Sequence, residues 1–244
     1  MRTKTAERGG FLRRCVKLSI AALAAVLLLC FCISGAWLLR HYADARAQRQ
    51  LHEALRELPA DEPLGRLAGL REQYPAAGAW LSVPGVEEPV CLPDDNDFYI
   101  SHDVTGRENR YGALFLDSEQ TLRSANMTIY GHYGRQGEMF GALAAYRDPA
   151  FLAEHQSFTL ETPAGETEWR IVAVLLTPGG GKDFWEWREQ ASASPARIEA
   201  FAAEARARAL CATQEPVRPG DRLLSLVTCA YDYPNARLVV LAVG

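Results

Sequence analysis

Cys229 and Arg237, near the end of this 244-residue chain, are a pair of residues that can do chemistry together. Cys229 closes an apolar run that begins at Leu223, and Arg237 opens a second apolar run after a short polar loop. Two strand-like runs around a turn-rich loop predict an antiparallel hairpin, which brings thiol and guanidinium to the same end of a sheet. Because a fixed cation favours a thiolate and stabilises an oxyanion formed nearby, the pair indicates a reactive cysteine.

His132 is the candidate base for that cysteine. It follows an apolar run and lies between Gly131 and Gly134, which let backbone and ligand approach closely. Taken alone, a histidine at a strand end is more often structural or solvated than catalytic. Cys229 alone is more often a small buried side chain, and Arg237 alone a solvated cation.

The elements that position these side chains are predicted to be mainly β-strands. Many short apolar runs between turn residues are typical of a sandwich or barrel. The runs are AWLSV at 79–83, EPVCL at 88–92, DFYIS at 97–101, ALFLD at 113–117, MTIYG at 127–131, SFTLET at 157–162, EWRIVAVLLT at 168–177, LLSLVTC at 223–229 and RLVVLAV at 237–243.

One long insertion, at about 178–222, interrupts this strand pattern. It contains the glycines 179–181, the aromatic FWEW at 184–187, and a run at 195–212 that begins with Pro195 and is rich in alanine. Proline at a first helical position followed by strong helix formers predicts a helix there. A helix inserted late in a β-domain is expected to form a wall or lid over a site.

The N-terminal region predicts a membrane anchor. Residues 1–17 carry six basic side chains and one acidic side chain, a net of +5, which leaves −9 for the remainder of a chain with a formal charge of −4. The uncharged stretch 18–39 is long enough, at about 1.5 Å per residue, to cross a hydrocarbon core of roughly 30 Å. A cleaved signal peptide is the alternative, but its apolar core is usually about 7–15 residues long.

Charge and helical pattern suggest what lies beyond the anchor. Leucines at 51, 55 and 58 recur at helical spacing, Pro59 interrupts them, and Pro63 is placed to open a second helix. This region is either a membrane-proximal stalk or, as the apolar stripe favours, a two-helix appendage packed on the main domain. Because the main domain is acidic, binding to nucleic acid through a basic surface is not expected.

Three of the six cysteines, Cys91, Cys211 and Cys229, lie in the main domain. An odd number cannot pair completely within one chain, so at least one thiol is free there. A Cys91–Cys211 disulfide is possible, although nothing in the spacing argues for it.

Several segments, in the order in which they follow along the chain, resemble the sortases. They most resemble the class B sortases, which are membrane-anchored cysteine transpeptidases of Gram-positive bacteria. The family pattern has a strand ending in YGH, then MF, and much later a TLxTC-like strand end with an arginine on the next strand. Here these are 130–132, 139–140, 226–229 and Arg237. The stretch 94–117 and the helical insertion also look like class B regions, so the resemblance covers about 79–244.

The resemblance implies a fold and a mechanism. The fold is a closed eight-stranded β-barrel with added helices: an N-terminal helical appendage, a helical insertion before the cysteine strand and a single transmembrane helix. Cys229 would attack the carbonyl after a threonine in a C-terminal sorting signal, His132 would move protons, and Arg237 would hold the carbonyl or stabilise the oxyanion. An amine of peptidoglycan or of a pilin would resolve the thioester, with no cofactor or metal. Thr228, Tyr133 and Asp232 are the candidate substrate contacts.

The sequence departs from the class B pattern in three places. Tyr133 stands where asparagine is common after the histidine, and Val227 stands where serine is common two residues before the cysteine. An acidic residue is common shortly after the cysteine, and Asp232 is the only candidate for it in this loop. Two alternatives stay open, and Tyr133 and Val227 motivate the first of them. One is a catalytically inactive, membrane-tethered binding module, and the other is a cysteine hydrolase that releases peptide to water.

The expected organisation follows from these arguments. Residues 1–17 form a cytoplasmic basic tail, 18–39 the anchor, 40–78 the helical appendage and 79–244 the catalytic barrel. A basic flank before the anchor predicts a cytoplasmic N-terminus and an extracellular catalytic domain. The expected partners are surface proteins bearing a C-terminal sorting signal and the acceptor amine; the exact sorting motif is not determined by the sequence.

Overall fold

The computed structural model describes residues 3–56, 65–134, 138–180, 195–218 and 220–244. The chain forms two compact units, Met1–Gln50 and Leu51–Gly244. The helices, including two 3-10 helices named η, are α1 (Thr3–Arg56), α2 (Gly65–Gln73), η1 (Phe98–Ile100), η2 (Phe140–Arg147), α3 (Pro149–Glu154) and α5 (Pro195–Ala207).

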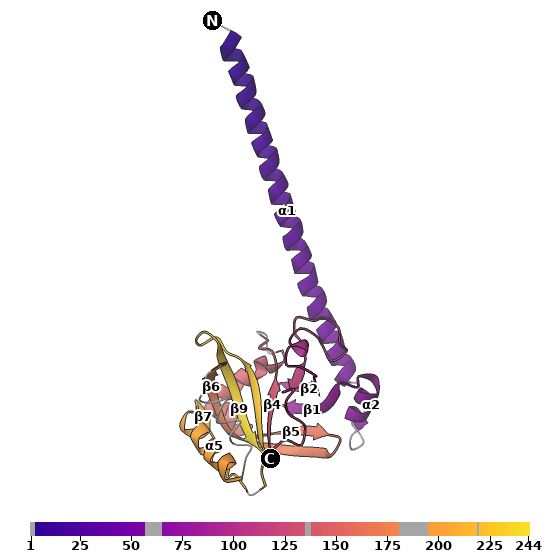
Figure 1. Cartoon of the computed structure of the whole chain (residues 1–244), viewed down its shortest axis with the longest axis vertical. Helices are drawn as coiled ribbons and strands as arrows, with labels where there is room; N and C mark the ends of the chain where they lie inside the picture. Colours follow the sequence, from indigo (N-terminus) through magenta and orange to yellow (C-terminus); the bar gives the residue numbers. More distant parts are fainter. Residues whose placement is uncertain (1–2, 57–64, 135–137, 181–194, 219) are drawn as a thin grey trace. The chain divides into compact units, whose positions relative to one another are not determined.

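The strands form one sheet in the second unit (Figure 1). They are β1 (Ala77–Val83), β2 (Val86–Cys91), β3 (Leu114–Leu116), β4 (Asn126–Tyr130), β5 (Ser157–Thr162), β6 (Gly165–Pro178), β7 (Cys211–Ala212), β8 (Leu223–Cys229) and β9 (Ala236–Val243).

Eight of these strands close into a barrel. Their hydrogen-bonded order is β5-β1-β2-β3-β4-β8-β9-β6, β6 pairs back onto β5, and the two-residue β7 adds to β6 outside the ring. Closure depends on the length of β6, because Gly165–Arg170 pairs with β5 while Arg170–Pro178 pairs with β9. The predicted closed eight-stranded barrel is thus confirmed.

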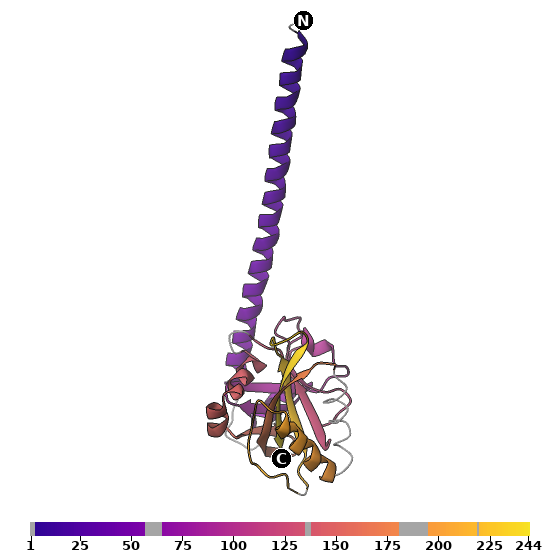
Figure 2. The same cartoon turned by 90° about the vertical axis from the view of Figure 1, so that its left-hand side faces the viewer.

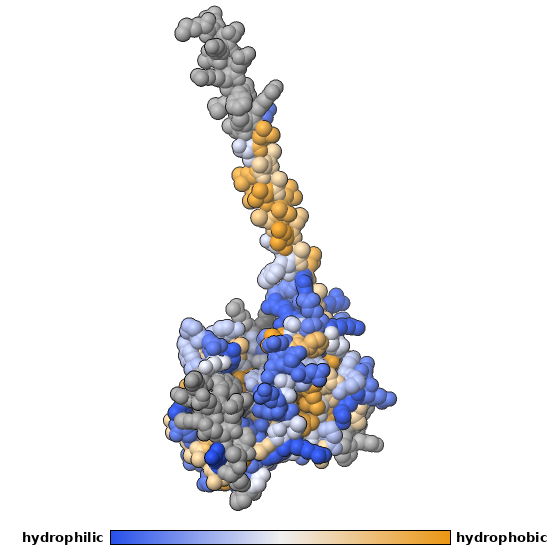
Figure 3. Space-filling view, in the orientation of Figure 1, coloured by the Kyte–Doolittle hydropathy of each residue, from blue (hydrophilic) through white to orange (hydrophobic). Residues whose placement is uncertain are grey.

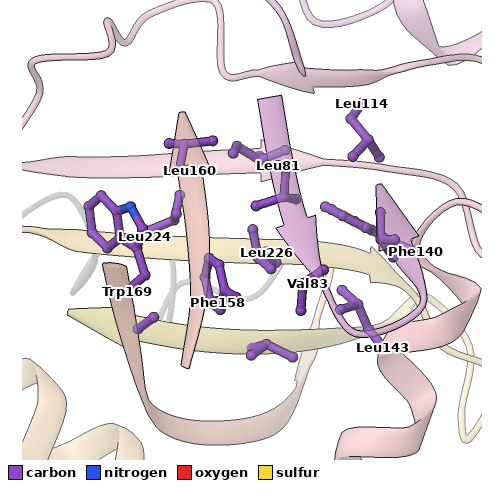
Figure 4. Packing of buried hydrophobic residues seen from close by; sticks show 14 of the residues in the cluster. Leu81, Val83, Leu114, Phe140, Leu143, Phe158, Leu160, Trp169, Leu224 and Leu226 are labelled. Carbon is purple, nitrogen blue, oxygen red and sulfur yellow. The ribbon is translucent and has the colours of Figure 1, made fainter. Parts of the chain in front are cut away.

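The alternation of apolar side chains along the strands builds two cores from one sheet. On β8, Leu224 and Leu226 point into the barrel interior, whereas Leu223 and Val227 join the cluster that packs against α5. Side chains from many strands, and Phe140 and Leu143 of η2, meet in the interior (Figure 4). Because successive strand residues face opposite sides, a strand covered on both sides is mostly apolar, as residues 223–227 are apart from the buried Ser225.

Short helices cover the outside of the barrel. Helix α5 lies along β6 and β9 through Ile198, Phe201 and Ala202, and both views of the chain show it there (Figures 1 and 2). On another side, Leu55 from the end of α1 and Leu70 of α2 pack with Trp80 of β1. Burial of these apolar side chains is what attaches the helices to the sheet.

Helix α1 carries the apolar segment expected to be an anchor. Within the described residues, one helical stretch, Lys17–Leu55, is long and apolar enough to cross a membrane by length and composition, with a mean hydropathy of 2.5 in its most apolar window. The large apolar side chains of residues 18–39 are exposed, and the space-filling view shows them as an orange band (Figure 3). The helix runs unbroken across residues 39 and 40, where an anchor and a separate appendage were expected to meet.

The expected strand at 97–101 is wrong, because Phe98–Ile100 is the 3-10 helix η1. The Asp95 carboxylate accepts hydrogen bonds from the backbone N–H groups of Asp97 and Phe98, both at 2.8 Å. A side chain that takes up backbone donors in this way favours a turn over a strand ladder.

The expected helix at 195–212 ends early, at Ala207. Leu210 N–H donates to the Val174 carbonyl at 2.8 Å, and Cys211–Ala212 pairs antiparallel with β6. The unpaired backbone groups on this edge of β6 capture a segment whose composition favours helix. Pro59, Pro63 and the FWEW segment lie outside the described residues.

Candidate active site

Parallel pairing of β4 with β8 brings His132 level with Cys229. Tyr130 is paired with Val227 in the last register position, and Gly131 N–H donates to the Val227 carbonyl at 3.1 Å. Two residues further along lie His132, just after the end of β4, and Cys229, the last residue of β8. Because the carboxyl ends of parallel strands meet at one edge of a sheet, the two side chains reach the same end of the barrel.

The β8–β9 hairpin brings Arg237 directly opposite Cys229, as the sequence predicted. Facing residues of an antiparallel pair project to the same side of the sheet. The loop between them turns through Asn235, whose φ of 60° lies in the left-handed region that asparagine tolerates. Thiol and guanidinium therefore share one side of the sheet end.

These side chains line a single pocket of about 540 Å³. Its lining residues are Asn96, Asp97, Ile100, Phe115, Tyr130, Gly131, His132, Gly179, Val227, Thr228, Cys229 and Arg237. Of the six site residues predicted from the sequence, four are brought together here: His132, Thr228, Cys229 and Arg237. Tyr133 and Asp232 do not line the pocket and lie in the loops that directly follow His132 and Cys229.

A backbone carbonyl orients the His132 ring. Nε2 of His132 lies 2.6 Å from the carbonyl oxygen of Ile100, the last residue of η1. A carbonyl oxygen only accepts, so Nε2 carries a proton and Nδ1 is the ring nitrogen left to gain or lose one. The turn that replaced the expected strand at 97–101 thus supplies a group that defines the tautomer of the histidine.

Gly112 leaves room for this arrangement. Its φ is +59°, and a Cβ built there meets the Tyr99 carbonyl oxygen first and lies 2.9 Å from the Ile100 oxygen and 3.1 Å from Cδ2 of His132. Alanine at 112 therefore strains the backbone and displaces both partners of the Ile100–His132 hydrogen bond.

We expect Gly112→Ala to lower stability by about 1–3 kcal/mol and turnover by about 10²-fold, because the ring of His132 loses its position. Thermal unfolding and steady-state kinetics of the full-length protein measure the two effects. Gly106→Ala is the matched control: its φ is +76°, but nothing lies within 4 Å of its Cβ position. Equal losses of turnover in both variants would contradict the positional argument.

Gly179 similarly lets the backbone approach Arg237. A Cβ at Gly179 would lie 2.8 Å from Cζ and 3.1 Å from Nε of Arg237, and Gly179 N–H donates to the Asn235 carbonyl at 2.7 Å. The start of the insertion and the β8–β9 loop are thereby held together around the guanidinium. This close approach of its backbone to the guanidinium is a physical role for Gly179 at the site.

The cysteines of the barrel differ in environment. Cys91, Cys211 and Cys229 are all free thiols, so the disulfide considered between Cys91 and Cys211 is not formed. Cys91 is fully buried, and burial raises its pKa to about 12. Burial, and then the nearby Asp148 carboxylate, also raise the pKa of Cys211, whose Sγ donates to the Tyr146 carbonyl.

We expect iodoacetamide at about pH 8 to alkylate Cys229 and to leave Cys91 unmodified in the native protein. With a pKa of about 12, Cys91 is thiolate in roughly one molecule in 10⁴ at that pH, and the thiolate is the reactive form. Peptide mapping by mass spectrometry distinguishes the two sites. Alkylation of Cys91 as fast as that of Cys229, without unfolding, would contradict the burial argument.

Several pocket residues were not singled out from the sequence. Asn96, Asp97 and Ile100 come from the polar turn and η1, and Phe115 and Tyr130 come from β3 and β4. The stretch 94–117 carried a family resemblance, but that signal does not say which of its side chains face the cysteine. Among the described residues, no group of three or more His, Cys, Asp or Glu side chains is placed to hold a metal ion.

Comparison with known proteins gives one family throughout. The sequence profile described as Sortase domain matches residues 93–244. Sortase B of Listeria monocytogenes is 29% identical over 167 residues, a match that covers 66% of this chain and 66% of that protein, just under two thirds of its length.

Solved structures agree with the sequence matches. The X-ray structure of Clostridium perfringens sortase B is 28% identical with a TM-score of 0.66, and the match covers 72% of this chain and 98% of that one. The Staphylococcus aureus sortase B–substrate complex is 20% identical with a TM-score of 0.70, covering 82% and 95%, and at that identity it supports the fold alone.

Proposed function

Because this chain belongs to the sortase family, we propose that it is a class B-type cysteine transpeptidase. It cleaves a C-terminal sorting signal after threonine and transfers the protein to an amine of peptidoglycan or of a pilin. The observation that carries the proposal is that His132, Cys229 and Arg237 line one pocket at the end of the barrel.

Cys229 is the proposed nucleophile. Its thiolate attacks the carbonyl carbon after the threonine, and the resulting tetrahedral intermediate collapses to a thioester as the peptide amine leaves. His132 gives that amine a proton from Nδ1 and then takes a proton from the incoming amine, which attacks the thioester and frees Cys229. The Ile100 carbonyl supports this role, because it accepts the hydrogen bond of Nε2 and leaves Nδ1 for proton transfer.

Arg237 is proposed to bind the oxyanion of the tetrahedral intermediate. The register of β8 and β9 supports this role, since Arg237 lies directly opposite Cys229 on the neighbouring strand and both residues line the pocket. A guanidinium offers several N–H donors in a planar fork, which suits a developing negative charge. Thr228 is a proposed substrate contact because it lines the pocket beside Cys229.

We expect Arg237→Lys to lower kcat by about 10²–10³-fold, because an ammonium group cannot reproduce the fork of donors. KM should change much less, since the lost interaction acts mainly in the transition state. Steady-state kinetics with a cleaved peptide measure both constants. The control is Arg208→Lys, in the turn directly after α5, whose kcat should equal that of the unmodified enzyme. An Arg237→Lys enzyme with the kcat of the unmodified enzyme would argue against the role of Arg237.

The proposed location follows from α1. Its apolar segment anchors the protein in the cell membrane, with the basic residues 1–17 in the cytoplasm and the barrel outside. The substrates are then surface proteins carrying a sorting signal, and the acceptor is a cell-wall or pilin amine reached on the outer side.

The test uses the full-length protein in detergent with a panel of sorting peptides, with and without a glycine-based amine, followed by intact-mass spectrometry. We expect a covalent adduct on Cys229 that the amine converts into an amine-linked product. An adduct resolved only to free acid, whatever amine is present, would favour the hydrolase. No adduct, together with a Cys229 inert to iodoacetamide, would favour the inactive binding module.

A further inference from the structure

The loop that follows Cys229, residues 230–235, is attached at two consecutive positions to the segment that follows His132. The ring of Tyr231 packs edge-on against the ring of Tyr133, with centroids 5.4 Å apart and an interplanar angle of 80°. The next residue, Asp232, accepts hydrogen bonds from both terminal nitrogens of Arg147, at 2.6 and 3.3 Å. Each partner comes from the histidine side of the pocket, far away in sequence.

The histidine side offers a firm support for these contacts. Phe140 N–H donates to the His132 carbonyl at 3.0 Å, and Tyr133 forms a β-bridge with Met139. Met139 holds a φ of 51° and a ψ of −135°, a combination that costs free energy for a residue with a Cβ. Its side chain is 3% exposed in the barrel core, and that burial holds the strained backbone in place.

The cysteine side depends more on outside contacts. Residues 231–235 are all exposed, and Tyr231 keeps 70% of its surface accessible. A loop with little burial of its own samples several conformations unless other segments hold it. A half-exposed ion pair alone restrains a loop weakly, but two contacts on adjacent residues, one aromatic and one bidentate, restrict both its position and its rotation.

We propose that the Tyr133–Tyr231 and Arg147–Asp232 contacts form a clasp that positions the loop after Cys229 and thereby sets the geometry between Cys229 and His132. The four are positioning residues, which act through Cys229 and His132 and not on the substrate. The clasp deepens the proposed function and rests on it for its effect on turnover. Tyr133 is essential to it, because the asparagine common at this place in class B sortases has no ring to meet Tyr231.

The expected effect is on rate and not on substrate binding. A displacement of about 1 Å between reacting groups costs up to about 10²-fold in rate. Loss of one contact, in Tyr231→Ala or Asp232→Asn, should lower kcat about 10-fold, and loss of both about 100-fold. KM should stay nearly unchanged, because none of the four residues lines the pocket.

Three controls separate positioning from other roles. Tyr133→Phe keeps the ring and should keep the activity, whereas Tyr133→Asn should lose about as much as Tyr231→Ala. The exchanged pair Arg147→Asp with Asp232→Arg should recover most of the activity that Asp232→Asn loses, since it restores the ion pair in reverse. Glu204→Gln removes an ion pair of similar exposure in α5, with Arg208 at 2.7 Å, and should have no effect.

The experiment measures, on the full-length protein in detergent, kcat and KM for a cleaved peptide and the rate of Cys229 alkylation by iodoacetamide against pH. His132→Ala defines the alkylation profile without the histidine. We expect the clasp variants to shift the profile toward that of His132→Ala, while Tyr133→Phe and Glu204→Gln keep the original one.

Three results would overturn the clasp. The first is an unchanged alkylation profile in the variant that combines Tyr231→Ala with Asp232→Asn. The second is failure of the exchanged charge pair to recover the activity that Asp232→Asn loses. The third is a His132→Ala alkylation profile identical to that of the unmodified protein. Because alkylation needs no peptide, the alkylation profiles test the clasp independently of the proposed function. A protein that never forms an acyl-enzyme, yet shows the expected profile shifts, would refute the transpeptidase and keep the clasp.

Discussion

Replacing Cys229 with alanine will abolish formation of the acyl-enzyme and lower turnover by about 10⁴-fold or more. The thioester cannot form without the sulfur, and no other described thiol lines the pocket. Intact-mass spectrometry after incubation with a cleaved sorting peptide should show an adduct on the unmodified enzyme and none on the variant. Product release by chromatography gives the residual rate.

Cys211→Ala is the matched control for this prediction. Cys211 is a half-buried thiol on β7, outside the pocket, so its removal should leave adduct formation unchanged apart from a small loss of stability. Melting temperatures of the two variants should be compared with that of the unmodified protein. Full transpeptidation by Cys229→Ala would refute the proposed mechanism.

Replacing His132 with alanine will lower kcat by about 10²–10⁴-fold, the usual contribution of a positioned acid and base. The variant lacks the group proposed to protonate the leaving amine and to deprotonate the incoming one. The rate should therefore respond less steeply to pH than that of the unmodified enzyme. Single-turnover kinetics with and without the amine separate the loss in acylation from the loss in transfer.

His155→Ala provides the comparison, because it removes a histidine that packs against Phe151 at the end of α3 and does not line the pocket. We expect it to keep the pH profile and the rate of the unmodified enzyme. A His132→Ala enzyme with normal kcat and an unchanged pH profile would assign proton transfer to another group.

Local pattern was sufficient for much of the fold. The runs at 223–229 and 237–243 predicted the β8–β9 hairpin and the pairing of Cys229 with Arg237, which the structure confirms. Such a hairpin is decided by residues close together in sequence: apolar runs on each side and turn residues between. The barrel was also foreseen, although only the resemblance to a family specified its closure and strand number.

The errors lie where another group competes for the hydrogen bonds of the backbone. At 97–101 the apolar pattern favoured a strand, but the Asp95 carboxylate takes up the donors that a neighbouring strand would have used. At 211–212 the composition favoured helix, but the free edge of β6 offered hydrogen bonds that a helix end leaves unmade. The Asp95 turn is local, and a carboxylate just before an apolar run is a turn signal that the strand pattern left out. The outcome at 211–212 is not visible from local propensity, because it depends on which segments are brought together.

By itself, the sequence determined the residue types that can do chemistry, His132, Cys229 and Arg237, and the strand ends that carry them. Only the tertiary structure decided how they meet and what surrounds them: the parallel β4–β8 register, the Ile100 carbonyl on His132, and the Arg147–Asp232 contact across 85 residues. The physical reason is that side-chain identity and strand periodicity are local properties of the chain. The position of one strand end relative to another is decided by the packing of the whole barrel.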